Sequence, residues 1–382
     1  MGKIATMEWF RVPPRWLFVK ITDEAGNIGW GEASLEGHSQ AVEGCLDAWF
    51  ERYKGMEADD IEHIWQLSWR TSFYRGGPVL MSALSGIDIA LWDLKARKLG
   101  VPIHQLLGGK LRTKLRVYAW IGGDRPDDVE KQATARRDQG FRAVKMNGTE
   151  DLGWLDAPAA LDGCVARVQA VKNLGMDVGV DFHGRVHKPM AKQLAKALEP
   201  HRPLFIEEPL LSEHPTGIEE LKALTTIPVA LGERLHSRWD VRPLLPHVDI
   251  LQPDVCHVGG ISELRRIAAL AETYDVALAP HCPLGPIALA ACVQVDLASP
   301  NFAIQEMSLG IHYNAQNGSQ QDLTSYTHNP EVWAVEDGFI QMPTGPGLGI
   351  EIDEEQVRRL AKDAKPWLTP GFIGPGGEIR EW

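Results

Sequence analysis

The sequence has 382 residues, more than a typical domain of about 100–200 residues, so two domains or one large barrel with an attached segment are expected. Hydrophobic residues make up 44% of the chain and charged residues 24%, proportions that exclude a disordered or fibrous protein. The 39 basic and 51 acidic residues give a net charge of −12, which argues against binding to nucleic acid or to an anionic membrane surface.

Two further features concern the location of the protein. The sequence lacks a run of the about 20 apolar residues that a transmembrane helix needs, and its first residues do not follow the pattern of a signal peptide. The five cysteines are scattered without a Cys-x-x-Cys spacing, which indicates neither a disulfide scaffold nor a structural zinc site. We therefore expect a soluble cytoplasmic protein without a membrane partner.

The first part of the chain has the pattern of a small α+β domain, which we assign to residues 1–113. Three segments alternate like strands: Ile4–Phe10, Trp16–Thr22 and Ile28–Glu32. A turn at Asp23–Asn27 predicts that the last two form a hairpin. The apolar spacing then becomes helical, and the clearest helix is Met81–Lys98, which Gly100 and Pro102 are expected to end.

After the first domain, short apolar runs alternate with amphipathic helical segments such as Glu130–Gln139 and Ile261–Tyr274. There are eight such runs: Leu115–Trp120, Ala143–Asn147, Val178–His183, Leu204–Glu207, Val229–Glu233, Ile250–Asp254, Ala277–His281 and Phe302–Glu306. Eight successive βα units are typical of a (β/α)8 barrel, which usually takes about 250 residues. We assign the barrel to residues 114–325 and expect residues 326–382 to pack back on the first domain.

Ionisable side chains recur at the ends of these runs, where a barrel places its active site. They are Asp181, Glu207, Glu233, Asp254, His281 and Glu306. One such carboxylate is more often a helix cap or a solvated charge, but three on adjacent strands repel one another unless a cation neutralises them. We therefore expect Asp181, Glu207 and Glu233 to hold a metal ion. Oxygen ligands favour Mg²⁺, with Mn²⁺ as the alternative, over zinc.

Two histidines are expected beside this metal. His183 is two residues after Asp181, so the alternation of a strand would turn both to the same face. Asp254 and His281 end neighbouring strands and could pair, so that the carboxylate orients the imidazole and raises its pKa. Five other histidines, which fall in loops or next to helix starts, are expected at the surface: His187, His201, His236, His247 and His257.

Such a site could remove the proton beside a carboxylate group, because a metal stabilises the negative charge that then develops on the substrate. One histidine would remove the proton and a second acid would complete the reaction. Return of a proton to carbon 2 would make the protein a racemase or epimerase. Protonation of a departing β-hydroxyl would make it a dehydratase.

The domain order and the Asp/Glu/Glu ligand set resemble the enolase superfamily, specifically its mandelate racemase subgroup, over essentially the whole chain. The resemblance implies an α/β fold: a modified (β/α)8 barrel with an α+β N-terminal capping domain that the C-terminal tail completes. It also implies that His281, paired with Asp254, is the general base and that Glu306 hydrogen-bonds the substrate carboxylate or its enediolate. Many relatives carry Lys-x-Lys on the second strand. Here the segment is Lys145-Met146-Asn147, which argues against a lysine/histidine racemase.

Within this subgroup the sequence is similar to the enzymes that dehydrate acid sugars, and D-galactonate in particular. The motifs that carry this similarity are Asp181–Val186, Phe73–Pro78, Gly123–Pro126, Pro280–Pro286 and Gly310–Asn314. The resemblance implies that His281 takes the proton from carbon 2 and that His183 protonates the leaving 3-hydroxyl, which yields 2-dehydro-3-deoxy-D-galactonate. A dehydratase of another aldonate and an acid-sugar epimerase remain the alternatives, and a barrel without catalytic activity is disfavoured because none of the expected ligands or bases is missing.

Four residues are candidates for contacts with the sugar-acid substrate. Arg15 and Trp16 belong to a loop at Arg11–Trp16 that could reach the polyol end. Lys145 and Asn147 could contact the carboxylate or the hydroxyls. Relatives of this kind usually assemble symmetrically, so the resemblance also implies a homo-oligomer.

Overall fold

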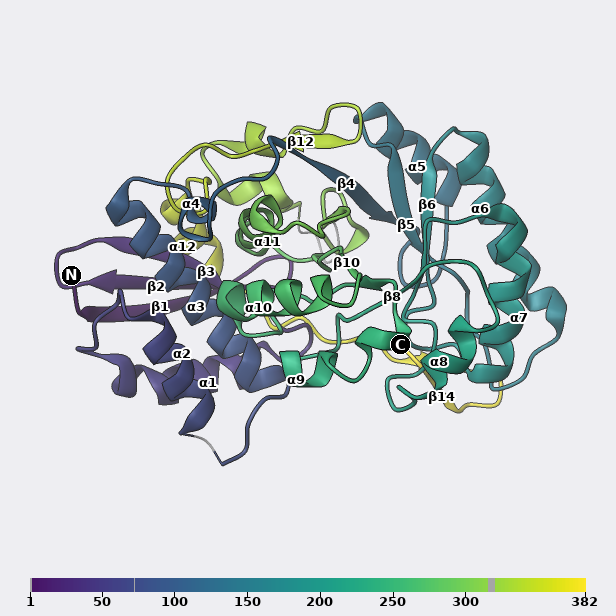
Figure 1. Cartoon of the computed structure of the whole chain (residues 1–382), viewed down its shortest axis with the longest axis horizontal. Helices are drawn as coiled ribbons and strands as arrows, with labels where there is room; N and C mark the ends of the chain where they lie inside the picture. The colour runs from purple at the N-terminus through teal and green to yellow at the C-terminus, as the bar shows by residue number, and fades with distance from the viewer. Residues whose placement is uncertain (1, 72, 315–319) are drawn as a thin grey trace.

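The computed structural model describes residues 2–71, 73–314 and 320–382, and it has two parts that lie side by side in Figure 1. The N-terminal part is a three-stranded antiparallel sheet with helices. Its elements are β1 (Ile4–Val12), β2 (Trp16–Asp23), β3 (Ile28–Glu32), α1 (Ser39–Tyr53), α2 (Ile61–Arg70), α3 (Pro78–Leu99) and α4 (Ile103–Leu106). The predicted hairpin and the long helix are both confirmed.

Helix α3 forms where the sequence indicates, and its ends follow ordinary capping chemistry. Pro78 stands at its first turn, where the missing N–H costs nothing, and Gly100 ends it in the left-handed conformation with φ 68°. The helix lies directly on β3: a Cβ atom at Gly31 would be 1.9 Å from the carbonyl oxygen of Gly86. Glycine at this position therefore allows the close contact between sheet and helix.

The second part is the barrel, and within the described residues it has eight parallel strands in the order β10-β9-β8-β7-β6-β5-β4-β11. They are β4 (Lys114–Ile121), β5 (Ala143–Asn147), β6 (Asp177–Asp181), β7 (Ile206–Glu207), β8 (Val229–Leu231), β9 (Ile250–Leu251), β10 (Ala277–Leu278) and β11 (Gln305–Met307). A parallel bridge between Leu278 and Phe302 closes the ring. The predicted barrel fold is confirmed.

Helices connect the strands and cover the outside of the barrel (Figure 1). They are α5 (Val129–Asp138), α6 (Asp162–Asn173), α7 (Lys188–Leu198), α8 (Gly217–Lys222), α9 (Arg238–Val241), α10 (Gly260–Glu272) and α11 (Pro286–Ala298). Short 3-10 helices lie at Pro158–Leu161, Glu199–His201, Leu245–His247, Leu323–Tyr326 and Pro330–Trp333. Helices α10 and α11 lie between the barrel and the N-terminal part.

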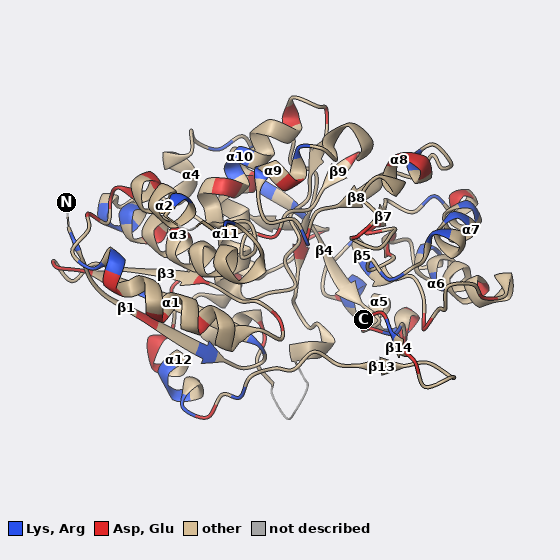
Figure 2. Cartoon of the chain, turned by 90° about the horizontal axis from the view of Figure 1, so that it is seen from below, with Lys and Arg blue, Asp and Glu red and all other residues tan. Residues whose placement is uncertain are grey.

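The last part of the chain contacts both the barrel and the N-terminal part. Strand β12 (Phe339–Gln341) pairs with β4, and helix α12 (Glu354–Ala361) packs on β1. Lys20 Nζ, on the neighbouring strand β2, lies 2.7 Å from Glu354 Oε1. The chain then returns to the barrel as β13 (Phe372–Ile373) and β14 (Ile379–Arg380), as Figure 2 shows. The sequence predicts that all of residues 326–382 pack on the first domain. The final residues lie against the barrel instead, where Arg125 Nη2 donates to the carbonyl of Glu381 at 3.0 Å.

The length and apolarity of the helices bear on membrane insertion. Of the helices in the described part of the chain, none combines the length and the apolar character that crossing a bilayer requires.

Candidate active site

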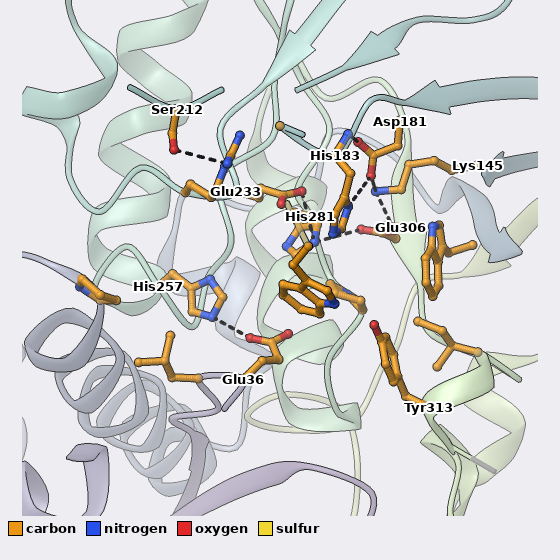
Figure 3. A pocket seen from close by; sticks show the side chains of 18 of the residues that line it. Glu36, Lys145, Asp181, His183, Ser212, Glu233, His257, His281, Glu306 and Tyr313 are labelled. Carbon is orange, nitrogen blue, oxygen red and sulfur yellow. Dashed lines mark hydrogen bonds and ion pairs between the residues drawn. The ribbon is translucent and has the colours of Figure 1, made fainter. Parts of the chain in front are cut away.

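The loops at the carboxyl ends of the barrel strands surround a cavity of about 510 Å³, which the N-terminal part closes from one side (Figure 3). Its walls come from three regions of the chain. Arg15, Leu35 and Glu36 belong to the N-terminal part, most other lining residues belong to the barrel, and Trp382 comes from the end of the sequence. The cavity is therefore completed by residues that are far apart in the sequence.

Three carboxylates come together at the carboxyl ends of three neighbouring barrel strands. Asp181 ends β6, Glu207 ends β7 and Glu233 follows β8, and each offers an oxygen within 4.8 Å of the others. Asp181 and Glu207 are buried, and Glu233 is half-buried. Such a group of oxygen ligands could hold a hard divalent cation, as the sequence suggested.

The charge around the three carboxylates is unbalanced. Lys145 Nζ lies 2.5 Å from Glu207 Oε1 and 3.0 Å from Glu306 Oε1, so one ammonium group faces several carboxylates. Burial raises the pKa of Glu207 well above its usual value, although Lys145 acts against this increase. Burial opposes ionisation of Asp181 as well, but the hydrogen bonds and charge of His183 lower its pKa below the usual value. A divalent cation fits this excess of negative charge.

His281 and Asp254 form the pair that the sequence predicts. His281 Nδ1 lies 2.8 Å from Asp254 Oδ2, and His281 Nε2 lies 3.5 Å from Glu233 Oε2. Burial lowers the pKa of His281, but the charge of Glu233 and the hydrogen bond with Asp254 outweigh burial and raise the pKa to about 10. Because Glu233 contributes to this increase, the basicity of His281 depends on whether that carboxylate is neutralised.

His183 lies beside Asp181 as predicted, but the backbone conformation that brings it there is not the predicted one. The strand ends at Asp181, and His183 itself has a positive φ of 56°, so strand alternation does not orient it. Its backbone N–H donates to Asp181 Oδ1 at 2.6 Å, and its Nδ1 lies 3.2 Å from Asp181 Oδ2. The predicted neighbourhood is therefore present, but a turn that the Asp181 side chain caps produces it.

The candidate substrate residues lie in different surroundings. Lys145 and Arg15 line the cavity, and the Arg15 guanidinium lies 3.8 Å from the centre of the Tyr313 ring. The described residues that line the cavity do not include Trp16 or Asn147. Trp16 begins β2 and is fully buried, so it belongs to the core and the expectation for it was wrong. The Asn147 side chain is also buried and donates to the carbonyls of Gly123 and Asp124.

Sequence reasoning missed Glu36 and His257. His257 was expected at the surface, but it is buried and lines the cavity. Its Nε2 lies 3.5 Å from Glu36 Oε2, and its Nδ1 lies 3.9 Å from Asp254 Oδ2 (Figure 3). The sequence offered one signal, the spacing of three residues between Asp254 and His257. In the structure a helical turn begins at Asp254, since the N–H of His257 donates to the carbonyl of Asp254. Such a turn brings residues three apart to one side.

Trp382 was also missed, because no pattern in the sequence connects it with the barrel. Its ring lies edge-on to His183, with 5.5 Å between the ring centres and an angle of 84° between the planes. It also lies near Trp367, which contacts Tyr313. Aromatic side chains therefore form the wall of the cavity on the side of His183.

Comparison with known proteins agrees with this architecture. Residues 12–108 match the mandelate racemase / muconate lactonizing enzyme N-terminal domain, and residues 128–356 match the enolase C-terminal domain-like family. Over all of both chains, the sequence is 48% identical to the D-galactonate dehydratase of Ralstonia pickettii (strain 12J) and 46% identical to that of Variovorax paradoxus (strain S110).

Solved structures show the same arrangement of the two parts. An enolase from Agrobacterium radiobacter with bound sodium and L-malate has a TM-score of 0.88 and 30% sequence identity, with 99% of each chain covered. A mandelate racemase/muconate lactonizing enzyme from Jannaschia sp. CCS1 has a TM-score of 0.81 and 30% identity, with 94% of this chain and 97% of the other covered. The chain therefore belongs to the mandelate racemase and muconate lactonizing enzyme family of the enolase superfamily.

Proposed function

We propose that the protein is a Mg²⁺-dependent dehydratase of a sugar acid, and that D-galactonate is its substrate. The observation that carries this proposal is the presence of two histidines at one cluster of carboxylates: His281 Nε2 lies 3.5 Å from Glu233 and His183 Nδ1 lies 3.2 Å from Asp181. A base and a separate acid are what elimination of water requires. The similarity to D-galactonate dehydratases, at 46–48% identity over whole chains, supports the choice of substrate.

Asp181, Glu207 and Glu233 would hold the Mg²⁺ ion, with Mn²⁺ as an alternative in the same oxygen site. When bound, the cation would stabilise the negative charge that develops on the substrate carboxylate after loss of the α-proton. Gln252 Nε2 donates to Glu207 Oε2 at 2.7 Å and Lys145 donates to the other oxygen, so the Glu207 carboxylate is held in one orientation.

His281 is the general base in this proposal. Asp254 binds Nδ1 of its ring, so Nε2 is the atom that takes the proton from carbon 2. Glu306 lies beside the same nitrogen, 4.0 Å from it, and this proximity supports the proposal that it hydrogen-bonds the substrate carboxylate or its enediolate. Asp254 has no exposed side-chain surface, which keeps the pair in one arrangement.

His183 is the general acid. Asp181 binds its Nδ1, which leaves the other ring nitrogen to give a proton to the 3-hydroxyl as the carbon–oxygen bond breaks. Water then leaves, and the enol becomes the ketone when carbon 3 takes a proton. The product would be 2-dehydro-3-deoxy-D-galactonate.

The far end of the cavity suits the hydroxyl groups of the substrate. Arg15, Glu36 and His257 lie there, and Arg15 Nη2 is 3.8 Å from Glu36 Oε1. These charged groups can both donate and accept hydrogen bonds, as a polyol chain requires. We propose that they, and not Trp16, contact the end of the sugar acid that is remote from the carboxylate.

The test is turnover of a panel of aldonates by the purified protein with Mg²⁺, with detection of 2-keto-3-deoxy acids. We expect a selective signal with D-galactonate that EDTA removes and that His183→Asn abolishes. Turnover of another aldonate alone would refute the choice of substrate. A product of unchanged mass would instead identify an epimerase and refute dehydration.

A further inference from the structure

Two buried carboxylates of the N-terminal part accept hydrogen bonds from the first backbone amides of barrel helices. Glu32, the last residue of β3, binds the N-terminus of α11, and Asp88 of α3 binds that of α10. These two helices follow the loops that carry His281 and Asp254. Figure 1 shows α3, α10 and α11 side by side where the two parts of the molecule meet.

Glu32 takes the place of a normal helix cap. Its Oε1 accepts from the N–H of Gly285 at 2.9 Å, and its Oε2 accepts from the N–H of Ala288 at 2.9 Å. Gly285 is the residue before α11, and Ala288 is the third residue of the helix, so these are the two amides that the two side chains of a capping box would bind. Ser34 Oγ donates to the same carboxylate at 2.7 Å. The carboxylate is thus fixed from both sides.

Glu32 also contacts the segment that carries Asp254, the carboxylate partner of His281. The backbone carbonyl of Glu32 accepts from Cys256 Sγ at 3.3 Å. The N–H of Cys256 in turn donates to Asp254 Oδ1 at 2.7 Å. The side chain of Glu32 therefore binds the segment that follows His281, and its backbone binds the segment that follows Asp254.

The same short stretch of the N-terminal part reaches the substrate cavity. Glu32 is followed closely by Leu35 and Glu36, and both line the cavity. A shift of this stretch relative to α11 would change the distance between the far wall of the cavity and His281 Nε2. Misplacement by about 1 Å is enough to cost about a hundredfold in rate when a proton must move between oriented groups.

We propose that Glu32 is a positioning residue, which sets the His281–Asp254 pair in register with the wall of the cavity that the N-terminal part supplies. The inference rests on the proposed function, because it assigns the effect to proton removal at carbon 2. Glu32 itself does not line the cavity and acts through the backbone of the loop between His281 and α11.

The chain offers a matched control for this role. Asp93 of α3 is also fully buried and also accepts from two backbone amides, those of Trp30 and Leu348, at 2.9 and 2.8 Å. Replacement of either carboxylate by its amide leaves one acceptor oxygen for two N–H donors. Each carboxylate also binds one side chain, Ser34 at Glu32 and Arg97 at Asp93, so Asp93→Asn weakens an ion pair as well. Asp93→Asn is therefore at least as disruptive to packing as Glu32→Gln, but only the contacts of Glu32 lie on a segment that carries the pair.

The experiment compares Glu32→Gln with Asp93→Asn in the full-length protein. We expect Glu32→Gln to lower kcat by about tenfold to a hundredfold with a smaller change in KM, and to raise the isotope effect on kcat for substrate deuterated at carbon 2. Asp93→Asn should leave that isotope effect unchanged, even where it lowers Tm. An unchanged isotope effect in folded Glu32→Gln protein, or an equal increase in both variants, would overturn the proposal.

Two further measurements keep the test independent of folding and of the reaction. Gly285→Ala places a Cβ atom 2.6 Å from Glu32 Oε2 and disturbs the same contact from the barrel side, so it should raise the isotope effect as well. Hydrogen exchange at the amides of Gly285 and Ala288 should become faster in Glu32→Gln but not in Asp93→Asn, whether or not the protein is active. If the wild type does not turn over aldonates but exchange is faster in Glu32→Gln, the proposed function is refuted and the contact of Glu32 with α11 stands. If exchange is unchanged in Glu32→Gln, the inference itself is refuted.

Discussion

His281 Nδ1 lies 2.8 Å from Asp254 Oδ2, although the two residues follow different strands, β10 and β9. The pair depends on the register of neighbouring loops, and Asp254 is held in turn by the N–H of Cys256. His183 is bound to a different carboxylate, that of Asp181. Because the two imidazoles have different carboxylate partners, their roles can be tested one at a time.

Replacement of each histidine should stop dehydration at a different step. We expect His281→Asn to abolish both product formation and the exchange of the carbon 2 proton with solvent, because the base is lost. His183→Asn should also abolish product formation but retain exchange at carbon 2. Proton NMR of D-galactonate in D2O with Mg²⁺ measures both quantities. Loss of exchange in His183→Asn, with retention in His281→Asn, would reverse the two roles.

Two consecutive glutamates give a matched test of the metal site. Glu207 belongs to the carboxylate group, whereas Glu208 turns away from it and binds Arg234 Nη2 at 2.8 Å. We expect Glu207→Gln to weaken Mg²⁺ binding by at least about tenfold, because the amide carries no charge to balance the cation. Glu208→Gln should bind Mg²⁺ as the wild type does. Calorimetric titration with Mg²⁺ checks both variants, and equal affinities would argue against the assigned ligands.

The contact between Glu36 and His257 predicts a pH-dependent contribution to stability. Burial lowers the pKa of His257, but the negative charges of Asp254 and Glu36 outweigh it and raise the pKa from 6.5 to about 9. Because the pKa is raised on folding, the contribution is complete below pH 6.5 and is lost as the pH rises through about 9. Glu36→Gln should therefore reduce the free energy of unfolding more at pH 6 than at pH 10.

A half-buried ion pair elsewhere in the N-terminal part provides the control for that prediction. Glu43 binds Arg11, whose charge does not change in this range, with 2.5 Å between Glu43 Oε2 and Arg11 Nη2. The effect of Glu43→Gln on the free energy of unfolding should be the same at both pH values. Denaturant titrations of the three proteins measure these differences. The same loss at pH 6 and pH 10 for Glu36→Gln would contradict the assignment of a charged His257.

The packing of α3 on β3 predicts opposite effects of alanine at two glycines. Alanine at Gly31 would bring its Cβ atom to 1.9 Å from the carbonyl oxygen of Gly86, so we expect Gly31→Ala to lose about 3 kcal/mol or more of stability. Gly44 is exposed in α1, with no atom within 4 Å of such a Cβ. Gly44→Ala should gain about 0.5–1 kcal/mol, because alanine favours the helix. Thermal unfolding compares the two.

Much of the fold could be predicted because local patterns determine it. The apolar runs and the amphipathic helices recur with the periods of strands and helices, so the eight βα units were visible in the sequence. The ends of the strands were less predictable. Strands β8 to β10 end two or three residues before the functional side chains, since the hydrogen bonds of a strand stop where its neighbour turns away.

Some residues of the candidate site could likewise be predicted from the sequence, and others could not. Five residues could be found because each ends or closely follows a strand, and the barrel brings the ends of strands together: Asp181, Glu207, Glu233, Asp254 and His281. Glu36 and Trp382 could not be found, because their positions depend on how the N-terminal part and the end of the sequence pack on the barrel. Trp16 was misplaced for the opposite reason: β2 begins at this residue, so the loop is too short to expose it.

The most direct test of the account is one NMR experiment on the wild-type protein with D-galactonate and Mg²⁺ in D2O. We expect 2-dehydro-3-deoxy-galactonate to form with deuterium at carbon 3, and EDTA to stop the reaction. Formation of an epimer labelled at carbon 2, without loss of water, or turnover that continues after the metal is removed, would contradict the proposed dehydratase.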